Sequence, residues 1–253
     1  MNGQPAGSLD TGNERFAGQN LLAKLSERDA EALHPYLAPL TLERDAVLFE
    51  PGDDVVQCVF PADAAMVSLV VGLPNGALVE TATIGREGAV GGIVSLGHKP
   101  AFARAVVQVG GPAYRIATEQ LERCKETSGT FRDLLSRYAD CLIAQVLQSV
   151  ACNALHDLER RLSRWLLTAQ DRLGSEEVPL TQEFLAEMLG VQRTTVTAVA
   201  STLQARGLIR YQRGRITVLD RQGLETGSCP CYLAVRNHFE VVLPGVYPVM
   251  PAT

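Results

Sequence analysis

One short stretch, LGVQRTTVTAVASTLQARGLI at residues 189–209, carries the side chains best suited to recognition chemistry. Its apolar residues recur at helical spacing, at Val196, Val199, Ala200 and Leu203. Its polar residues fall on the other side of the same helix, at Gln192, Arg193, Thr194, Thr195, Thr197 and Ser201. An arginine can donate two hydrogen bonds to one guanine, and amide or hydroxyl groups can contact bases or phosphates. We therefore expect a helix with a buried apolar face and a polar face that contacts nucleic acid.

The flanking residues predict the elements that would position this helix. Thr181 can cap a preceding helix over QEFLAEML, and Gly190 permits a sharp turn between the two helices. This order is a helix-turn-helix arrangement, whose second helix enters the major groove of DNA. GLIRYQRGRITVLD then predicts two short strands, a wing that would place Arg213 and Arg215 on the phosphate backbone. The alternative is an ordinary helical hairpin with a solvated arginine face.

Charge along the chain supports the first interpretation. The net charge is −5, yet the charged residues from 190 to 219 are all arginines: Arg193, Arg206, Arg210, Arg213 and Arg215. Residues 1–118 carry eight basic and thirteen acidic side chains. A positive stripe on an acidic protein is the layout that phosphate contacts require.

A long helix is predicted upstream, between residues 119 and 156. One seam of this helix repeats at spacings of 4, 3, 4, 3 and 4 residues, at Leu134, Tyr138, Cys141, Gln145, Gln148 and Cys152. A second stripe is also apolar, so we expect one face to pack on the protein's own strands and the other on a second subunit. Gln145 and Gln148 would then fix the register. The alternative is a monomer in which this is a central core helix.

Short β-branched runs between residues 47 and 116 predict a double-sheet β roll, or jelly roll. The sequence PNG at 74–76 lies between two valine-rich runs and predicts a hairpin. A helix is expected at about 20–36, with Ser26 in a capping box, and residues 1–18 are expected to be disordered. Together these elements predict an α+β protein.

The sequence resembles the Crp/Fnr family of bacterial transcription regulators over about residues 20–226. The resemblance rests on LTQEFLAEMLGVQRTTVTAVASTLQARGLIRYQRGRITVLDRQGLE, and on VLFEPGD, VQCVFPADAAMVSLV and ETATIGREGAVGG. It implies a homodimer joined through the long helix, with two winged helices on a near-palindromic site in double-stranded DNA. It also implies RNA polymerase as a partner. The expected regions are a β-roll sensor domain at 19–118, a linker and dimerisation helix at 119–156, a winged helix-turn-helix domain at 157–226 and an extension at 227–253.

Two departures from the family pattern affect what the protein would recognise. Thr194 and Ala198 replace a glutamate and an arginine of the recognition helix, so the operator should differ from the familiar one. In the roll, the residues matching the ribose and phosphate contacts of cyclic-AMP binders are missing. The residues that remain for an effector are Arg86, Glu87, Gly91, Gly92 and Arg104. A different small molecule, or none, is expected in place of a cyclic nucleotide.

No cofactor and no metal are expected. No cysteine precedes Cys58, which argues against the N-terminal iron–sulfur cluster of some family members, and the isolated histidines do not support haem. Cys229, Cys231 and His238 are weakly spaced ligands, and structural thiols are the expected alternative. No apolar run approaches the roughly 18 to 20 residues of a membrane span, and no leader pattern is present, so a cytoplasmic protein is expected.

The leading hypothesis is therefore a dimeric DNA-binding regulator that is not an enzyme, because no catalytic fingerprint is present. A hinge at residues 153–157, with Asp157 capping the following helix, would set the distance between the recognition helices. The alternative is a ligand-sensing module whose C-terminal domain mediates protein contacts.

Overall fold

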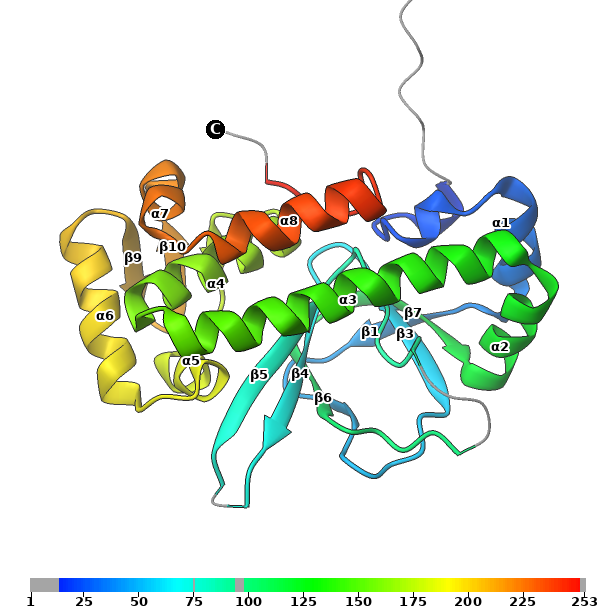
Figure 1. Ribbon diagram of the computed structural model, residues 1–253, viewed down its shortest axis with the longest axis horizontal. Helices are drawn as coiled ribbons and strands as arrows, with labels where there is room; N and C mark the ends of the chain where they lie inside the picture. The colour runs from blue at the N-terminus through cyan, green and yellow to red at the C-terminus, as the bar shows by residue number, and fades with distance from the viewer. Residues whose placement is uncertain (1–13, 75, 94–97, 251–253) are drawn as a thin grey trace, which may run out of the picture.

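The computed structural model describes residues 14–74, 76–93 and 98–250, and in it the helix α3 (Gly129–Leu155) runs in front of the β-strands (Figure 1). Two antiparallel sheets form the predicted roll, in the orders β1-β7-β3 and β2-β6-β4-β5. Their bounds are β1 (Ala38–Leu42), β2 (Val47–Phe49), β3 (Gln57–Pro61), β4 (Met66–Gly72), β5 (Leu78–Ile84), β6 (Arg104–Val109) and β7 (Gly111–Ala117). Buried side chains from both sheets share one cluster, so the sheets pack face to face. The α+β prediction is confirmed.

The predicted hairpin is present. β4 and β5 pair antiparallel on either side of the PNG sequence, with Val71 opposite Val79. Gly76 has a φ of +83°, a conformation that a glycine adopts without steric cost. Position 75 lies outside the described residues.

The N-terminal segment contains short helices instead of the single helix predicted at 20–36. They are the 3-10 helices η1 (Glu14–Phe16), η2 (Leu22–Lys24) and η3 (His34–Tyr36), and the α-helix α1 (Glu27–Leu33). Ser26 caps α1 as predicted, because its side chain accepts a hydrogen bond from the Asp29 amide. The expected disorder at 1–18 extends too far, since Phe16 is buried; residues 1–13 lie outside the described residues.

The long helical region is divided at Ser128 into α2 (Thr118–Thr127) and α3. Ser128 has an extended backbone, and its hydroxyl accepts a hydrogen bond from the Phe131 amide. A side chain that caps a helix in this way favours a new helix start over continuation.

The seam predicted on this helix for a second subunit is largely buried within the same chain, which is a correction. Tyr138, Cys141, Gln145 and Cys152 are buried. Gln145 donates to the Thr83 carbonyl, whereas Gln148 lies 3.1 Å from the Cys231 sulfur. Leu134 is a partly buried member of the core. The heptad spacing therefore marks the helix's intramolecular face. The apolar residues of α3 that remain exposed lie on another face of the helix, at Ile143, Leu147, Val150 and Leu155.

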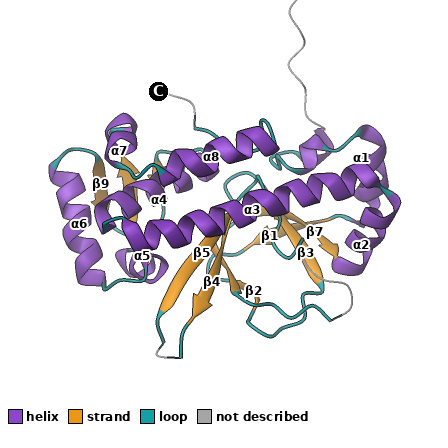
Figure 2. Cartoon of the chain, in the orientation of Figure 1, coloured by secondary structure: helices purple, strands orange, loops and turns teal. Residues whose placement is uncertain are grey.

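The C-terminal half contains a compact winged arrangement at the far end of α3 from α1 (Figures 1 and 2). Its elements are α4 (Leu158–Leu173), β8 (Glu177–Val178), α5 (Gln182–Leu189), α6 (Arg193–Ala205), β9 (Ile209–Gln212), β10 (Arg215–Val218) and α7 (Arg221–Gly227). Asp157 caps α4 as predicted, accepting from the Arg160 amide.

The last helix, α8 (Cys231–Val242), lies alongside α3 and also packs on α4. Tyr232 belongs to the core of the C-terminal half, whereas Phe239 belongs to a core formed with the roll and α3. The extension predicted at 227–253 therefore packs on both halves of the chain. Within the described part of the chain, no helix combines the length and apolarity needed to cross a membrane.

Candidate nucleic-acid interface

Helices α5 and α6 form the predicted helix-turn-helix. Thr181 caps α5 by accepting from the Phe184 amide, and α5 ends at Gly190, which has a φ of +65°. A Cβ at Gly190 would lie 2.7 Å from Val79 Cγ2, so this glycine allows both the turn and the close approach of α5 to β5. Val196 and Leu203 anchor α6 in the core beneath it.

The other face of α6 is exposed, as the sequence predicts. The exposed polar side chains are Gln192, Arg193, Thr194, Thr195, Thr197 and Ser201. Gln192 occupies the cap position without a side-chain capping bond, so its amide group is left for other contacts. The hydroxyls of Thr197 and Ser201 lie 2.9 and 2.8 Å from the carbonyl oxygens four residues earlier. A hydroxyl that donates inward still presents acceptor lone pairs outward.

The wing is a tight hairpin with an arginine at its tip. β9 and β10 pair antiparallel, with Gln212 opposite Arg215, so Arg213 and Gly214 alone form the turn. Arg213 has a φ of +49° and Gly214 a φ of +75°. Two-residue turns with both φ values positive favour asparagine or glycine. An exposed arginine therefore stands at a position whose backbone conformation favours asparagine or glycine.

Residues 190–219 contain no acidic side chain, but acidic side chains from other parts of the chain contact two of their arginines. Arg206 forms an ion pair with Glu159 of α4, and Arg215 pairs with Glu177 of β8 at 3.1 Å. Among the described residues, Arg193, Arg210 and Arg213 have no carboxylate within ion-pair distance. The unpaired charges of this stretch thus lie at the start of α6, on β9 and at the tip of the wing.

A buried polar network holds the winged arrangement against the roll. The guanidinium of Arg172 in α4 donates to Glu87 at 2.8 Å and to the Gln145 side chain at 3.0 Å. Its charged group also lies 5.4 Å from the ring centre of Tyr247. Burial acts to lower the pKa of Arg172, but Glu87, Tyr247 and Asp171 together outweigh it and raise that pKa. Both side chains of this ion pair are almost completely buried, so neither is free for a ligand.

A second carboxylate, Glu80 of β5, connects the roll to α4. It accepts hydrogen bonds from the indole of Trp165 at 2.9 Å and from Gln108 at 2.7 Å, and it also contacts the hydroxyl of Ser68. Sequence analysis missed both Glu80 and Arg172, because their partners are 85 residues away along the chain. No local spacing pattern encodes such a contact.

The residues predicted for an effector separate into different environments. An open cavity of about 400 Å³ lies between the roll and α3, and Gly91 lines it. Arg104 instead donates two hydrogen bonds to Glu50, which raises the pKa of the guanidinium. Arg86 lies 3.4 Å from the Asp171 carbonyl, and Glu87 pairs with Arg172. Gly92 packs near Ala89 and Cys58. The structure therefore does not gather these five residues into one site.

The cavity itself is apolar. Its walls include aromatic, aliphatic and glycine residues of the roll, together with two side chains of α3: Phe49, Leu69, Val71, Ile84, Ala101, Phe102, Leu142 and Val146. Among the lining residues that the structure describes, Thr81 carries the hydroxyl group. This described part of the lining suits an uncharged, largely apolar molecule and offers no cation for a phosphate.

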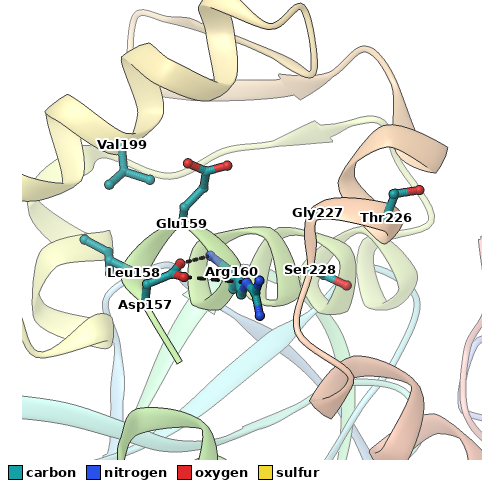
Figure 3. Close-up of a pocket in the computed structure, with 8 residues that line it drawn as sticks. All are labelled: Asp157, Leu158, Glu159, Arg160, Val199, Thr226, Gly227 and Ser228. Atoms are coloured by element: carbon teal, nitrogen blue, oxygen red, sulfur yellow. Dashed lines mark hydrogen bonds and ion pairs between the residues drawn. The ribbon is translucent and has the colours of Figure 1, made fainter. Parts of the chain in front are cut away.

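The hinge between α3 and α4 borders a larger open pocket of about 700 Å³ (Figure 3). Asp157 and Glu159 lie on one side of it, with Val199 of α6 nearby and Thr226 and Ser228 across it. The pocket is therefore bounded by the start of α4, by α6 and by the end of α7 with the residue that follows it.

Comparisons with known proteins agree with this geometry. A Crp-like helix-turn-helix domain matches residues 160–226. The global nitrogen regulator of Nostoc sp. (strain PCC 7120) is 27% identical over 188 residues, covering 70% of this chain and 83% of that protein.

The fold is similar to that of FixK2 from Bradyrhizobium japonicum, with a TM-score of 0.66 and 15% identity over 76% of this chain and 98% of that one. It is also similar to a Crp-family transcriptional regulator from Thermus thermophilus, with a TM-score of 0.64 and 19% identity over 75% of this chain and 96% of that one. The domain match, the sequence relative and the fold agree with the exposed polar face of α6. Residues 160–226 therefore carry a Crp-like helix-turn-helix domain, and the fold of the chain is similar to that of solved regulators of the Crp/Fnr family.

Proposed function

We propose that this protein is a transcription regulator of the Crp/Fnr type, which acts as a homodimer and reads a near-palindromic DNA site with the N-terminal part of α6. The observation that carries the proposal is the exposed face of α6, where Arg193 has no acidic partner among the described residues. Arg193 would donate to a guanine, while Gln192 and Thr194 contact neighbouring bases. Thr195, Thr197 and Ser201 would contact bases or phosphates, and Arg213 and Arg215 would contact the phosphate backbone.

A dimer is supported by the exposed apolar stripe on α3. Ile143, Leu147 and Val150 follow one another at spacings of 4 and 3 residues, and their exposed fractions are 56%, 65% and 65%. Large apolar side chains at heptad spacing favour pairing with a second helix. We expect two copies of this stripe to meet around a two-fold axis, which would give the DNA site its symmetry.

Two experiments test these points. Sedimentation of the wild-type protein should show a dimer, Leu147→Glu should give a monomer, and Leu233→Glu, at an exposed leucine of α8, should leave the dimer intact. Selection from random DNA duplexes should enrich two inverted half-sites whose centres are about one helical turn apart. A wild-type monomer, or the absence of any enriched sequence, would contradict the proposal.

The regulatory signal is proposed to be an apolar small molecule in the roll cavity. Leu142 and Val146 line this cavity, and Ile143 and Leu147 of the stripe are their neighbours on α3, so an occupant would act directly on the pairing helix. Calorimetric titration with cyclic AMP should show no binding. Apolar compounds that raise the unfolding temperature should lose this effect in Ala103→Trp, which fills the cavity.

RNA polymerase is the protein partner that a regulator of this type implies.

A further inference from the structure

Three cysteines and a histidine meet where the long helix, the hinge and the C-terminal extension come together. Cys152 lies near the end of α3, His156 follows this helix, and Cys229 and Cys231 stand at the start of α8. Their side-chain ligand atoms all lie within 4.8 Å of one another. The Cys152 and Cys229 sulfurs are 3.5 Å apart, and the Cys231 sulfur is 3.5 Å from His156 Nδ1.

The two 3.5 Å separations fit a mononuclear tetrahedral centre, and the remaining pairs, which lie within 4.8 Å, would have to close by no more than about 1 Å. Sulfur and nitrogen atoms about 2.3 and 2.1 Å from one zinc ion are separated from each other by roughly 3.5 to 3.8 Å. Three thiolates and one imidazole are a common ligand set of structural zinc sites. We infer that Cys152, His156, Cys229 and Cys231 form a binding site for a zinc-type divalent metal ion.

The surroundings suit the charge of such a site. Zinc with three thiolates carries a net charge of −1, and the thiols release three protons to solvent when the ion binds. Arg164 lines a small cavity together with Cys231. The Nε atoms of Arg161 and Arg164 are buried, and neither has a hydrogen-bond partner within the described part of the chain. Their positive charges would offset the negative centre.

A hydrogen bond outside the ligand set also favours the site. The side-chain amide of Gln148 lies 3.1 Å from the Cys231 sulfur and can donate to a thiolate there. The three cysteine side chains are almost completely buried, whereas His156 is partly exposed. The ion would therefore enter from the side of the histidine.

The sequence pattern pointed to a different group and to no metal. It paired Cys229 and Cys231 with His238, but His238 contacts Asp140 at 2.9 Å on the outer side of α3. The missing ligands come from the hinge, 77 residues before Cys229 in the case of Cys152. A bound ion would fasten the start of α8 to the joint between α3 and α4. It would thereby restrict the movement of the winged domain. This inference does not depend on the proposed DNA contacts or on the dimer.

The alternative explanation of this cluster is a disulfide bond between Cys152 and Cys229. The metal site accounts for all four side chains, whereas the disulfide leaves Cys231 and His156 unused. Full-length protein purified without chelator, without thiol reductant and under an inert atmosphere distinguishes the two alternatives, because a reductant would itself break a disulfide.

Elemental analysis should give about one zinc ion per chain for the wild type and for Cys124→Ser, a half-buried cysteine outside the cluster. The double variant Cys229→Ser with Cys231→Ser should contain almost none. Cobalt added to the metal-free wild type should give the absorption of tetrahedral thiolate coordination. His156→Ala, a change at a partly exposed residue, should weaken cobalt binding by more than about tenfold.

Thiol labelling of the wild type covers the case in which the cysteine variants fail to fold. Zinc should protect three of the six cysteines from a thiol reagent. A metal-free wild type that gives no cobalt absorption, zinc binding that survives the double variant, or a Cys152–Cys229 disulfide in the preparation made without reductant would each overturn the inference.

Discussion

Two arginines that meet carboxylates of the roll and two arginines on the exposed surface of α6 and the wing stand in opposite electrostatic situations. Arg104 donates twice to Glu50, and Arg172 of α4 inserts its charge against Glu87 of the roll. Arg193 and Arg213 are exposed, and neither forms an ion pair among the described residues. A phosphate entering the roll would have to compete with carboxylates, whereas a DNA phosphate would meet unpaired guanidinium groups. The difference indicates that an arginine of this protein is available to an anion only where no carboxylate already pairs with it.

The largest expected effect comes from breaking the buried ion pair. Arg172→Met leaves the buried Glu87 carboxylate without its charged partner, although the Gly85 amide still donates to it, and should lower the free energy of unfolding by about 3–5 kcal/mol. Arg104→Met removes a pair whose side chains are 42% and 44% exposed, and should cost no more than about 1 kcal/mol. Urea unfolding followed by the fluorescence of Trp165, the single tryptophan, measures both.

A control sharpens this contrast. Adding Glu87→Gln to Arg172→Met removes the uncompensated charge and should recover part of the lost stability. Equal losses for Arg172→Met and Arg104→Met would show that burial does not distinguish the two pairs.

At the wing, stability and DNA binding should change in opposite directions. Asparagine tolerates the positive φ of position 213 better than arginine, so Arg213→Asn should stabilise the fold by about 0.5–1 kcal/mol. The same change removes a phosphate contact, and the slope of log affinity against log salt should fall by about 1 for each chain bound. Arg213→Lys should keep the slope and gain no stability. If Arg213→Asn bound DNA with the wild-type slope, the wing tip would not touch the backbone.

The smallest effect concerns the arginine that is already paired. Glu177→Gln frees Arg215 from its exposed partner, and DNA affinity should rise by no more than roughly fivefold, since such pairs contribute about 0–1 kcal/mol. Glu176→Gln removes the same charge at the neighbouring exposed position and controls for long-range repulsion. Fluorescence anisotropy at low salt measures the difference. A larger gain from Glu176→Gln would mean that general charge matters more than the release of Arg215.

Features encoded by neighbouring residues could be predicted from the sequence. The caps at Ser26, Thr181 and Asp157, the hairpin between β4 and β5 and the exposed face of α6 all follow from spacings of a few residues. Contacts between distant segments could not be predicted in this way.

The seam on α3 illustrates the limit. The 4-3 spacing correctly predicted a buried face of the helix, but this face packs against the same chain and not against a second subunit. Sequence periodicity shows that a face is buried and does not identify what covers it. The cysteine and histidine cluster was missed for the same reason. Two of its members precede the winged domain and two follow it, so only the packing of α8 on α3 and α4 brings them together.

The central claim is that α6 reads bases through Arg193, and one measurement tests it most directly. The DNA duplexes selected by the wild-type protein are titrated in parallel with the wild type, with Arg193→Ala and with Arg123→Ala. The last variant is the control, because Arg123 is an exposed arginine on α2. In each titration series every base is varied at each position of the duplex. We predict that Arg193→Ala alone loses the preference for guanine at one position of each half-site, at a cost of about 1–3 kcal/mol per contact. Unchanged affinity and unchanged base preference in Arg193→Ala would contradict the account.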